Sequence, residues 1–347
     1  MRTLSLQIMK KGILDAIGNT PLISLENIRA SDKLNADILI KLELMNPSGS
    51  LKDRIYKEMF ESAIREGKLT RGMEVIEAST GNAGIACTLV GVALGFEVTV
   101  VMPEGMSKER SNIIVALGGR VILTPGSETD VDLSIQKVHQ VMSENEGKYW
   151  FPNQFENPSN PSAHFKTTGP EIWAQTEGMF DALVAAAGSG GTITGVGAFI
   201  RSKTDRISIY AAEPAEAPVL SGMRRGNHKI EGIGDGFVPA NLDLSLLDGV
   251  ITVSSEEAIA MTRKLHREEG IFCGISTGCN VVAAIKLSRR HPDFGRIVTI
   301  ANDSGNRYFS TEVFGVRKEF SGTDRGKELD ERSAELVNRH KDHLEVI

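Results

Sequence analysis

Short apolar runs alternate with amphipathic segments along most of this chain. In its first half, strands are predicted at 37–44, 73–77, 97–102 and 120–123, where apolar and β-branched residues gather. Helical spacing of apolar residues predicts helices at 55–64, 83–94 and 108–117, the first two ending at Gly67 and Gly95. This strand–helix order predicts an α/β protein whose parallel sheet is covered by helices.

The second half repeats the pattern. Strands are predicted at 182–187, 207–212, 250–253 and 297–300, and helices at 193–200 and 255–269. The segment 149–170, rich in Pro, Asn and Phe, is predicted to be a crossover between two parts of the fold. A length of 347 residues fits two α/β lobes or one large domain.

Composition and charge narrow the classes of function. The net charge is −6 and there is no basic run, so neither nucleic acid nor an anionic membrane is favoured as a partner. No apolar stretch approaches the roughly 20 residues that span a bilayer, and residues 1–12 lack a signal-peptide core, so a cytoplasmic protein is expected. The three cysteines, Cys87, Cys273 and Cys279, form no Cys-x-x-Cys pair and are interpreted as reduced, buried thiols. No metal site is predicted.

Many of the 35 glycines stand at strand-to-helix turns. The turn 187–192 follows a buried strand and opens a helix, so its backbone N–H groups and the hydroxyls of Ser189 and Thr192 could bind an anion. A tight turn without a ligand explains the same residues equally well. Nucleotide sites are disfavoured, because Gly-Lys-Ser/Thr is absent and Ile193 stands where a dinucleotide fingerprint needs its third glycine.

Three other turns carry polar residues at a helix start. Lys52 follows the Pro/Gly/Ser loop 46–51, beside a positive helix end that would favour a neutral amine for Schiff-base chemistry. Taken alone, however, a lysine at this position is better explained as a solvated side chain on the first helical turn. The turn 77–84 could hold a carboxylate on backbone N–H groups, or its hydroxyls could cap the helix. Ser276 likewise precedes a helix and could be a cap.

Taken together and in this order, nine motifs resemble one family. They are IGNTPL (17–22), NPSGSLKDR (46–54), STGNAGIA (79–86), QFENPSNPSAH (154–164), TTGPEIW (167–173), GSGGT (188–192), EGIGDGFVP (231–239), GISTG (274–278) and DSGNRYFST (303–311). From about residue 12 to 315 the chain resembles the cysteine synthase and cystathionine β-synthase branch of the fold-type-II pyridoxal-phosphate (PLP) enzymes. The resemblance implies the two-lobed fold of the tryptophan synthase β-like enzymes. Its large lobe would span 1–46 and 151–315, and its small mobile lobe 47–150. The charged C-terminal extension 316–347 lies beyond the resemblance, and its many charges predict an exposed helix or tail.

The resemblance also implies roles for individual residues. Lys52 would form the Schiff base and move the Cα proton, Asn82 would contact the 3′-oxygen of the cofactor, and Ser276 would face its pyridine nitrogen. The phosphate would be held by Gly188, Ser189, Gly190, Gly191 and Thr192. The substrate carboxylate would be bound near Ser79, Thr80, Gly81, Ala83 and Gln154, with Gly232 and Asp235 beside it.

The activity that the resemblance implies is β-replacement on an amino acid through an α-aminoacrylate. Cysteine synthesis from O-acetylserine and sulfide is the leading reading. One alternative is O-phosphoserine as donor, which would need an arginine in the pocket, and Arg224 and Arg225 lie near the segment 231–239. Another is serine or cysteine as donor and a thiol as acceptor, in cystathionine- or lanthionine-type chemistry with sulfide release. A deaminase or dehydratase would instead give ammonia and a keto acid.

The resemblance implies two partners: a second copy of the chain in a homodimer, and the C-terminal peptide of serine acetyltransferase. A catalytically silent homologue that binds a partner peptide is a reading of another class, disfavoured because Lys52, Asn82 and Ser276 are all present. Two positions depart from the family. Ala83 replaces a threonine that could bind the carboxylate, and Asp235 stands where many cysteine synthases carry alanine. Asp235 could bind an amino group, assist proton transfer or face solvent.

Overall fold

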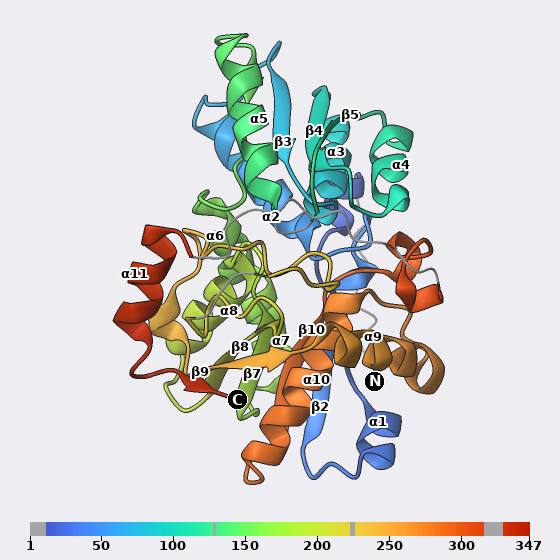
Figure 1. The fold of residues 1–347 in the computed structure, drawn as a ribbon, viewed down its shortest axis with the longest axis vertical. Coiled ribbons are helices and arrows are strands. Elements are labelled where there is room, and N and C mark those ends of the chain that lie inside the picture. The colour runs from blue at the N-terminus through green and yellow to red at the C-terminus, as the bar shows by residue number, and fades with distance from the viewer. Residues whose placement is uncertain (1–11, 128–129, 223–225, 316–328) are drawn as a thin grey trace, which may run out of the picture.

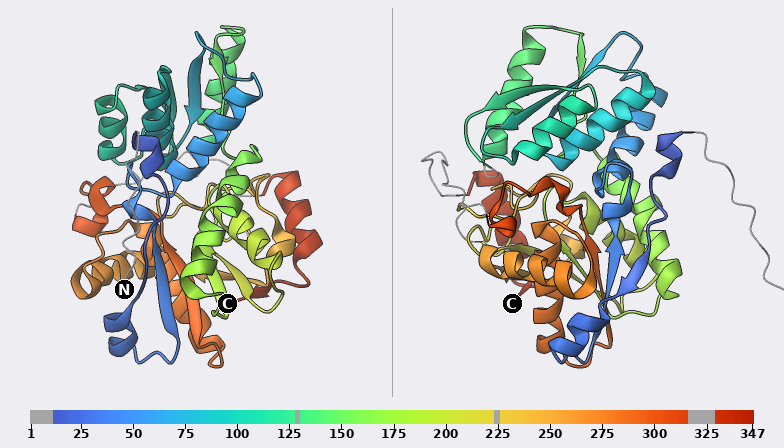
Figure 2. Two further views of the ribbon diagram at one scale, coloured as in Figure 1. Left: turned by 180° about the vertical axis from the view of Figure 1, so that it is seen from behind. Right: turned by 90° about the vertical axis from the view of Figure 1, so that its right-hand side faces the viewer.

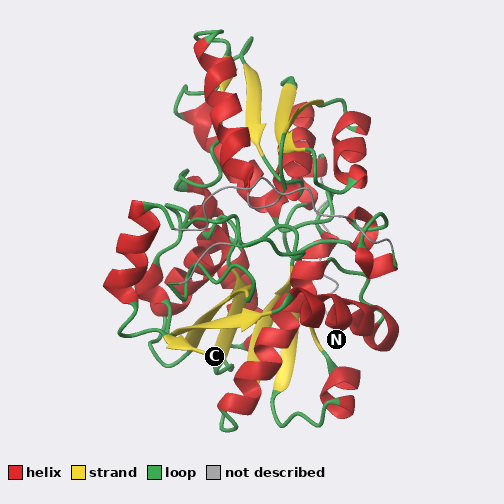
Figure 3. Cartoon of the chain, in the orientation of Figure 1, coloured by secondary structure: helices red, strands yellow, loops and turns green. Residues whose placement is uncertain are grey.

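The strands of this computed structural model form two sheets (Figures 1 and 3). The structure describes residues 12–127, 130–222, 226–315 and 329–347. The larger sheet has the order β1 (Leu22–Ser24), β2 (Asp37–Leu42), β10 (Arg296–Ala301), β7 (Ala182–Ala186), β8 (Ser208–Pro214), β9 (Gly249–Val253) and β11 (Glu345–Val346). Its described pairings are parallel except β1 with β2.

The smaller sheet is parallel throughout its described pairings, in the order β5 (Arg120–Thr124), β4 (Val98–Pro103), β3 (Glu74–Ala78) and β6 (Tyr149–Trp150). It lies above the larger sheet along the long axis of the molecule (Figure 2). The helices α2 (Lys52–Arg65), α3 (Asn82–Leu94), α4 (Lys108–Ala116) and α5 (Val131–Ser143) lie in this part of the chain.

The larger sheet is buried on both faces by helices. Ala182 and Val184 of β7 pack in one apolar cluster with residues of α10 (Ile275–Arg290), while Leu183 and Ala185 pack in a second cluster with residues of α8 (Gly191–Arg201). Such strands read as continuous apolar runs, which is why they were predictable. The remaining α-helices are α1 (Glu26–Ser31), α6 (Ser159–Lys166), α7 (Thr168–Thr176), α9 (Ser255–Lys264) and α11 (Glu331–His340).

The predicted α/β architecture with a mostly parallel sheet is confirmed, and every predicted strand overlaps an observed one. The crossover at 149–170 does connect the two sheets, but it contains α6. Pro158 is the N-cap of that helix and Pro161 lies in its first turn, where a missing backbone N–H costs little. In the sequence pattern these two prolines favour an extended linker, although in the structure they lie at the start of a helix.

The charged C-terminal segment is less exposed than expected. Of 316–347, residues 316–328 lie outside the described part. Beyond them Asp330 caps α11 by accepting a hydrogen bond from the backbone N–H of Ser333. Ser333 and Val337 are buried, and β11 adds to the larger sheet beside β9. The sequence pattern does not predict this buried face, because only two buried positions, one helical turn apart, stand among many charged residues.

Candidate active site

The glycine-rich turn lies between β7 and α8, where the sequence predicts it. Gly190 has φ +78°, and a Cβ on Gly191 would lie 1.8 Å from Oδ1 of Asn160, so a side chain is excluded there. The Ser189 hydroxyl accepts hydrogen bonds from Asn160 Nδ2 at 2.9 Å and from Lys52 Nζ at 3.3 Å. Its own proton stays available for donation, and the first N–H groups of α8 have no partner within that helix. The turn can therefore bind an anion.

Lys52 is the first residue of α2. It lines one pocket together with most of the residues that are predicted to bind the cofactor. The pocket is lined by Leu51, Lys52, Asn82, Ala185, Ala186, Gly188, Ser189, Gly190, Thr192, Gly232, Ile233, Ser276 and Asn302. Gly191 and the remaining predicted substrate residues lie outside this lining. A primary amine, an amide and an anion-binding turn thus meet in a single cavity.

Ser276 is the second residue of α10, whose N-cap is Gly274, so the capping alternative does not apply to it. Its hydroxyl accepts a hydrogen bond from Nδ2 of Asn302 at 3.1 Å, leaving its proton free to point into the pocket. Asn302 was missed by the sequence analysis. It directly precedes the motif 303–311, and that position was the available clue.

The predicted carboxylate turn is organised by Ser79. Its hydroxyl accepts from the backbone N–H groups of Gly81 and Gly84, at 2.9 and 2.8 Å. The N-cap of α3 is Gly81, so Ser79 lies before the cap and pairs with the N–H of the third helical residue. Ala83 is buried in an apolar cluster with residues of α2, α3 and the smaller sheet. The Gln154 side chain is buried, and its Oε1 has no hydrogen-bond partner among the described residues. Such an orphaned acceptor marks Gln154 as a group available to a ligand.

Asp235 lies close to the anion-binding turn but outside the pocket lining. Its side chain is buried, and its Oδ2 is 3.8 Å from where a Cβ on Gly188 would stand. Burial raises the pKa of Asp235 to about 6, and the nearby charge of Lys52 limits that rise. The solvent-facing reading of this aspartate is therefore wrong, because the carboxyl is enclosed. Arg224 and Arg225 lie outside the described residues.

His164 is a second residue that the sequence analysis missed, although it ends the quoted motif 154–164. Its Nε2 is 3.1 Å from the Thr192 hydroxyl and its Nδ1 is 2.8 Å from the Thr168 hydroxyl. Burial, together with the charge of Arg54, lowers the pKa of His164 to about 3. The ring is thus neutral and orients Thr192 at the anion-binding turn.

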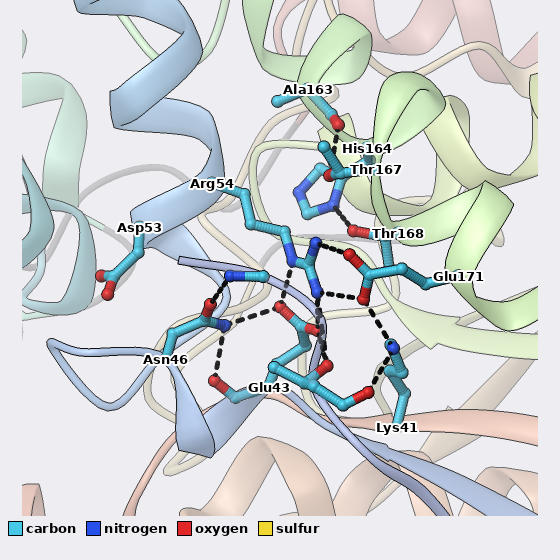
Figure 4. A network of polar contacts seen from close by, with 12 residues as sticks. Lys41, Glu43, Asn46, Asp53, Arg54, Ala163, His164, Thr167, Thr168 and Glu171 are labelled. Carbon is cyan, nitrogen blue, oxygen red and sulfur yellow. Dashed lines mark hydrogen bonds and ion pairs between the residues drawn. The ribbon is translucent and has the colours of Figure 1, made fainter. Parts of the chain in front are cut away.

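A buried ion network holds the helix that begins at Lys52 (Figure 4). The Arg54 guanidinium contacts Glu43 at 2.7 Å and Glu171 at 2.6 Å, and Lys41 Nζ lies 2.7 Å from Glu171. Burial opposes ionisation of Glu171, yet hydrogen bonds from Arg54 lower its pKa to about 2. Two cations and two anions therefore join α2 to β2, the turn after it and α7.

Among the described residues, no group of three or more His, Cys, Asp or Glu side chains could hold a metal ion. Cys87, Cys273 and Cys279 are buried and unpaired, and burial raises the pKa of each thiol. No helix within the described ranges is long and apolar enough to cross a membrane.

Residues 13–303 match the family model described as pyridoxal-phosphate dependent enzyme, and the chain belongs to that family. Over 309 residues it is 47% identical to the cysteine synthase of Buchnera aphidicola subsp. Schizaphis graminum, covering 86% of this chain and 94% of that protein. A hydrogen sulfide-producing enzyme from Fusobacterium nucleatum has a similar structure, with a TM-score of 0.83, 37% identity and coverage of 86% and 100% of the two chains. A cysteine synthase from Entamoeba histolytica gives 0.85, 34% identity and 98% coverage of both.

The pocket fits PLP, the cofactor of this family. The buried Oδ1 of Asn82 has no hydrogen-bond partner among the described residues, so it is available to a ligand. The turn at 188–192 suits a phosphate, and the Lys52 amine lies in the same cavity. The chain is thus a PLP-dependent enzyme.

Proposed function

We propose that this enzyme makes cysteine by replacing the β-acetoxy group of O-acetylserine with sulfide. The observation that carries the proposal is the pocket in which Lys52 Nζ lies 3.3 Å from Ser189 of the phosphate turn. Similarity to cysteine synthases over most of the chain supports the substrate pair.

When bound, PLP supplies an electron-withdrawing ring that acidifies the Cα–H bond of the amino acid and lets its β-substituent leave. Lys52 would hold the cofactor covalently and, once displaced by the substrate amine, would carry the proton to and from Cα. The Ser276 hydroxyl, held by Asn302, would contact the pyridine nitrogen. The turn formed by Ser79, Thr80 and Gly81, with Gln154, would bind the substrate carboxylate.

The activity is tested by incubating PLP-loaded protein with O-acetylserine and sulfide and measuring cysteine by chromatography. O-phosphoserine, serine and cysteine serve as competing donors in parallel reactions. Cysteine formed fastest from O-acetylserine supports the proposal. Ammonia and a keto acid as main products would identify a dehydratase-type reaction instead.

A second candidate uses a thiol as acceptor and releases sulfide from cysteine. The observation that favours it is the enclosed Asp235 carboxyl near Lys52, a group that could take a thiol proton or bind the amino group of a second amino acid. The similarity to a protein described as hydrogen sulfide-producing supports the same reading. Sulfide release from cysteine alone, measured with a sulfide electrode, distinguishes the two reactions.

Asp235 gives a prediction of pH dependence. Its pKa of about 6 lies above the ordinary value, so the carboxyl is protonated at pH 5 and ionised at pH 7. If the carboxylate accepts a proton, kcat/KM should fall as pH drops through 6, and Asp235→Asn should lose this part of the profile. Wild type and variant are compared with the same substrates, so titration of the substrates cancels. Identical profile shapes would remove Asp235 from the reaction.

The resemblance supports further proposals about organisation. We propose that residues 47–150 act as a mobile lobe that closes over the substrate, that the enzyme is a cytoplasmic homodimer, and that its active site accepts the C-terminal peptide of serine acetyltransferase. Analytical ultracentrifugation, and competition between that peptide and O-acetylserine, test the assembly and the peptide separately.

A further inference from the structure

The motif DSGNRYFST at 303–311 has no role in the reaction described so far, yet its side chains reach both parts of the proposed site. We propose that Asp303, Tyr308 and Arg110 form a relay of positioning residues. The relay would couple the cofactor-facing amide of Asn82 to the carboxylate turn at Thr80. The inference rests on the proposed roles of those two residues and goes beyond them.

The relay begins at Asn82. Its Nδ2 donates a hydrogen bond of 2.7 Å to Oδ2 of Asp303. Of the two amide atoms only the nitrogen can donate, so this hydrogen bond requires the amide nitrogen of Asn82 to face Asp303. The amide oxygen must then point the other way, and it is this atom that is buried without a partner among the described residues. Asp303 therefore fixes how the Asn82 amide is turned, and Nδ2 carries a second N–H that can donate to a ligand.

The second member is Tyr308, whose side chain is 0% exposed. Its hydroxyl donates to Oδ2 of Asp303 at 2.7 Å and accepts from Nη2 of Arg110 at 2.9 Å. A hydroxyl has a single proton, so accepting from the guanidinium leaves that proton for Asp303. The number of protons that each group can donate therefore fixes the direction of both hydrogen bonds of Tyr308. Buried bonds to charged groups of this kind are stronger than neutral ones.

Arg110 completes the relay from α4, on the side of the smaller sheet (Figure 1). Its Nη1 donates to the backbone carbonyl of Thr80 at 2.9 Å, and its Nη2 lies 3.3 Å from a carboxylate oxygen of Glu231. The guanidinium also lies 5.1 Å from the centre of the Tyr308 ring. One side chain thus holds the carboxylate turn and the segment beginning at Glu231, which carries Gly232 and Asp235.

The position of Arg110 is tightly defined by packing. A Cβ placed on Gly81 would lie 2.3 Å from Cδ of Arg110, so the turn rests directly on this side chain. Ser107, just before α4, donates to the backbone carbonyl of Arg307 at 2.6 Å and ties the same two regions together. Movement of the carboxylate turn would therefore pull on Tyr308 and Asp303, and through them on Asn82. Substrate binding and cofactor orientation become linked.

Tyr308→Phe tests the relay because it removes one hydroxyl and keeps the ring. The expected result has two parts. The relative heights of the cofactor absorbance bands above 300 nm should change without substrate, because Asp303 loses the Tyr308 donor that helps to hold it against the Asn82 amide. KM for O-acetylserine should rise about tenfold with kcat changed less than about threefold, as expected for lost buried hydrogen bonds to a binding element.

Tyr210→Phe is the matched control, since Tyr210 is also buried and its hydroxyl donates to Glu345 at 3.0 Å, away from the pocket. It should lose comparable thermal stability and keep both readouts. If Tyr308→Phe matches Tyr210→Phe in absorbance bands and in KM, the relay is wrong.

Asp303→Asn provides a second test if Tyr308→Phe does not fold. It keeps an acceptor oxygen for Asn82, so its changes should have the same direction and smaller size, and unchanged bands would overturn the proposal. Failure of the proposed function is separable from failure of the relay. If the wild-type enzyme forms no cysteine from O-acetylserine, the assignment of the donor is wrong. The comparison of wild-type and variant absorbance bands without substrate still tests the coupling to Asn82.

Discussion

Lys52→Ala is expected to abolish the visible absorbance band of the PLP-loaded enzyme and to lower kcat/KM by at least about a thousandfold. The substitution removes two functions of the Lys52 amine, the covalent attachment of the cofactor and the transfer of the Cα proton. Loss of a general base alone typically lowers the rate by a factor of about 10²–10⁴. Absorbance between 300 and 550 nm at equal PLP and protein concentrations measures the first effect. Cysteine formation from O-acetylserine measures the second.

Lys57→Ala is the matched control for this experiment. Lys57 lies on the same helix as Lys52, and its Nζ donates to the backbone carbonyl of Leu14 at 3.1 Å, outside the pocket. It should keep the band and the activity. Retention of a normal visible band by Lys52→Ala would mean that another amine holds the cofactor, and the assignment of Lys52 would be withdrawn.

Arg54→Met is expected to destabilise the protein by about 3–5 kcal/mol, the cost of removing one partner from a buried ion pair. Methionine retains much of the apolar volume, so the loss is mainly electrostatic. Glu43 is fully enclosed and would keep a carboxylate facing the vacated space, and Glu171 would retain only the charge of Lys41 in this network. Chemical denaturation followed by circular dichroism measures this change in the free energy of unfolding.

An exposed arginine provides the comparison. The Arg120 side chain is 53% exposed and pairs with Glu74 and Glu97, so Arg120→Met should cost no more than about 1 kcal/mol. If the two variants lose equal stability, the network around Arg54 carries no special weight. Because Arg54 lies two residues after Lys52, its loss should also weaken PLP binding, which titration of the visible band would detect.

The order of elements and the nature of the turns could be predicted from the sequence. Strands buried on both faces are continuous apolar runs, as at β4, where all six positions are buried. Glycine at 190 and 191 and lysine at 52 stand beside strand and helix boundaries, so their positions could be predicted locally, while their roles followed only from the resemblance. The family followed from nine such segments in a fixed order.

Contacts between distant residues could not be predicted in this way. Arg54 meets Glu171 across 117 positions, Asn82 meets Asp303 across 221, and Arg110 meets Tyr308 across 198. No periodicity records which buried charge will face which, since that depends on how two sheets and their helices pack. Asn302 and His164 were missed for the same reason, because each acts by holding a neighbour at the pocket.

The sequence by itself thus determined the α/β architecture, the family and the turns that carry the chemistry, because those depend on local pattern and on short segments. The tertiary structure decided which of the turns share one pocket, that Asp235 is enclosed, and that the helix near the C-terminus buries Ser333 and Val337 among its charged residues. Burial and the pairing of charges are properties of the packed chain, and a linear pattern does not contain them.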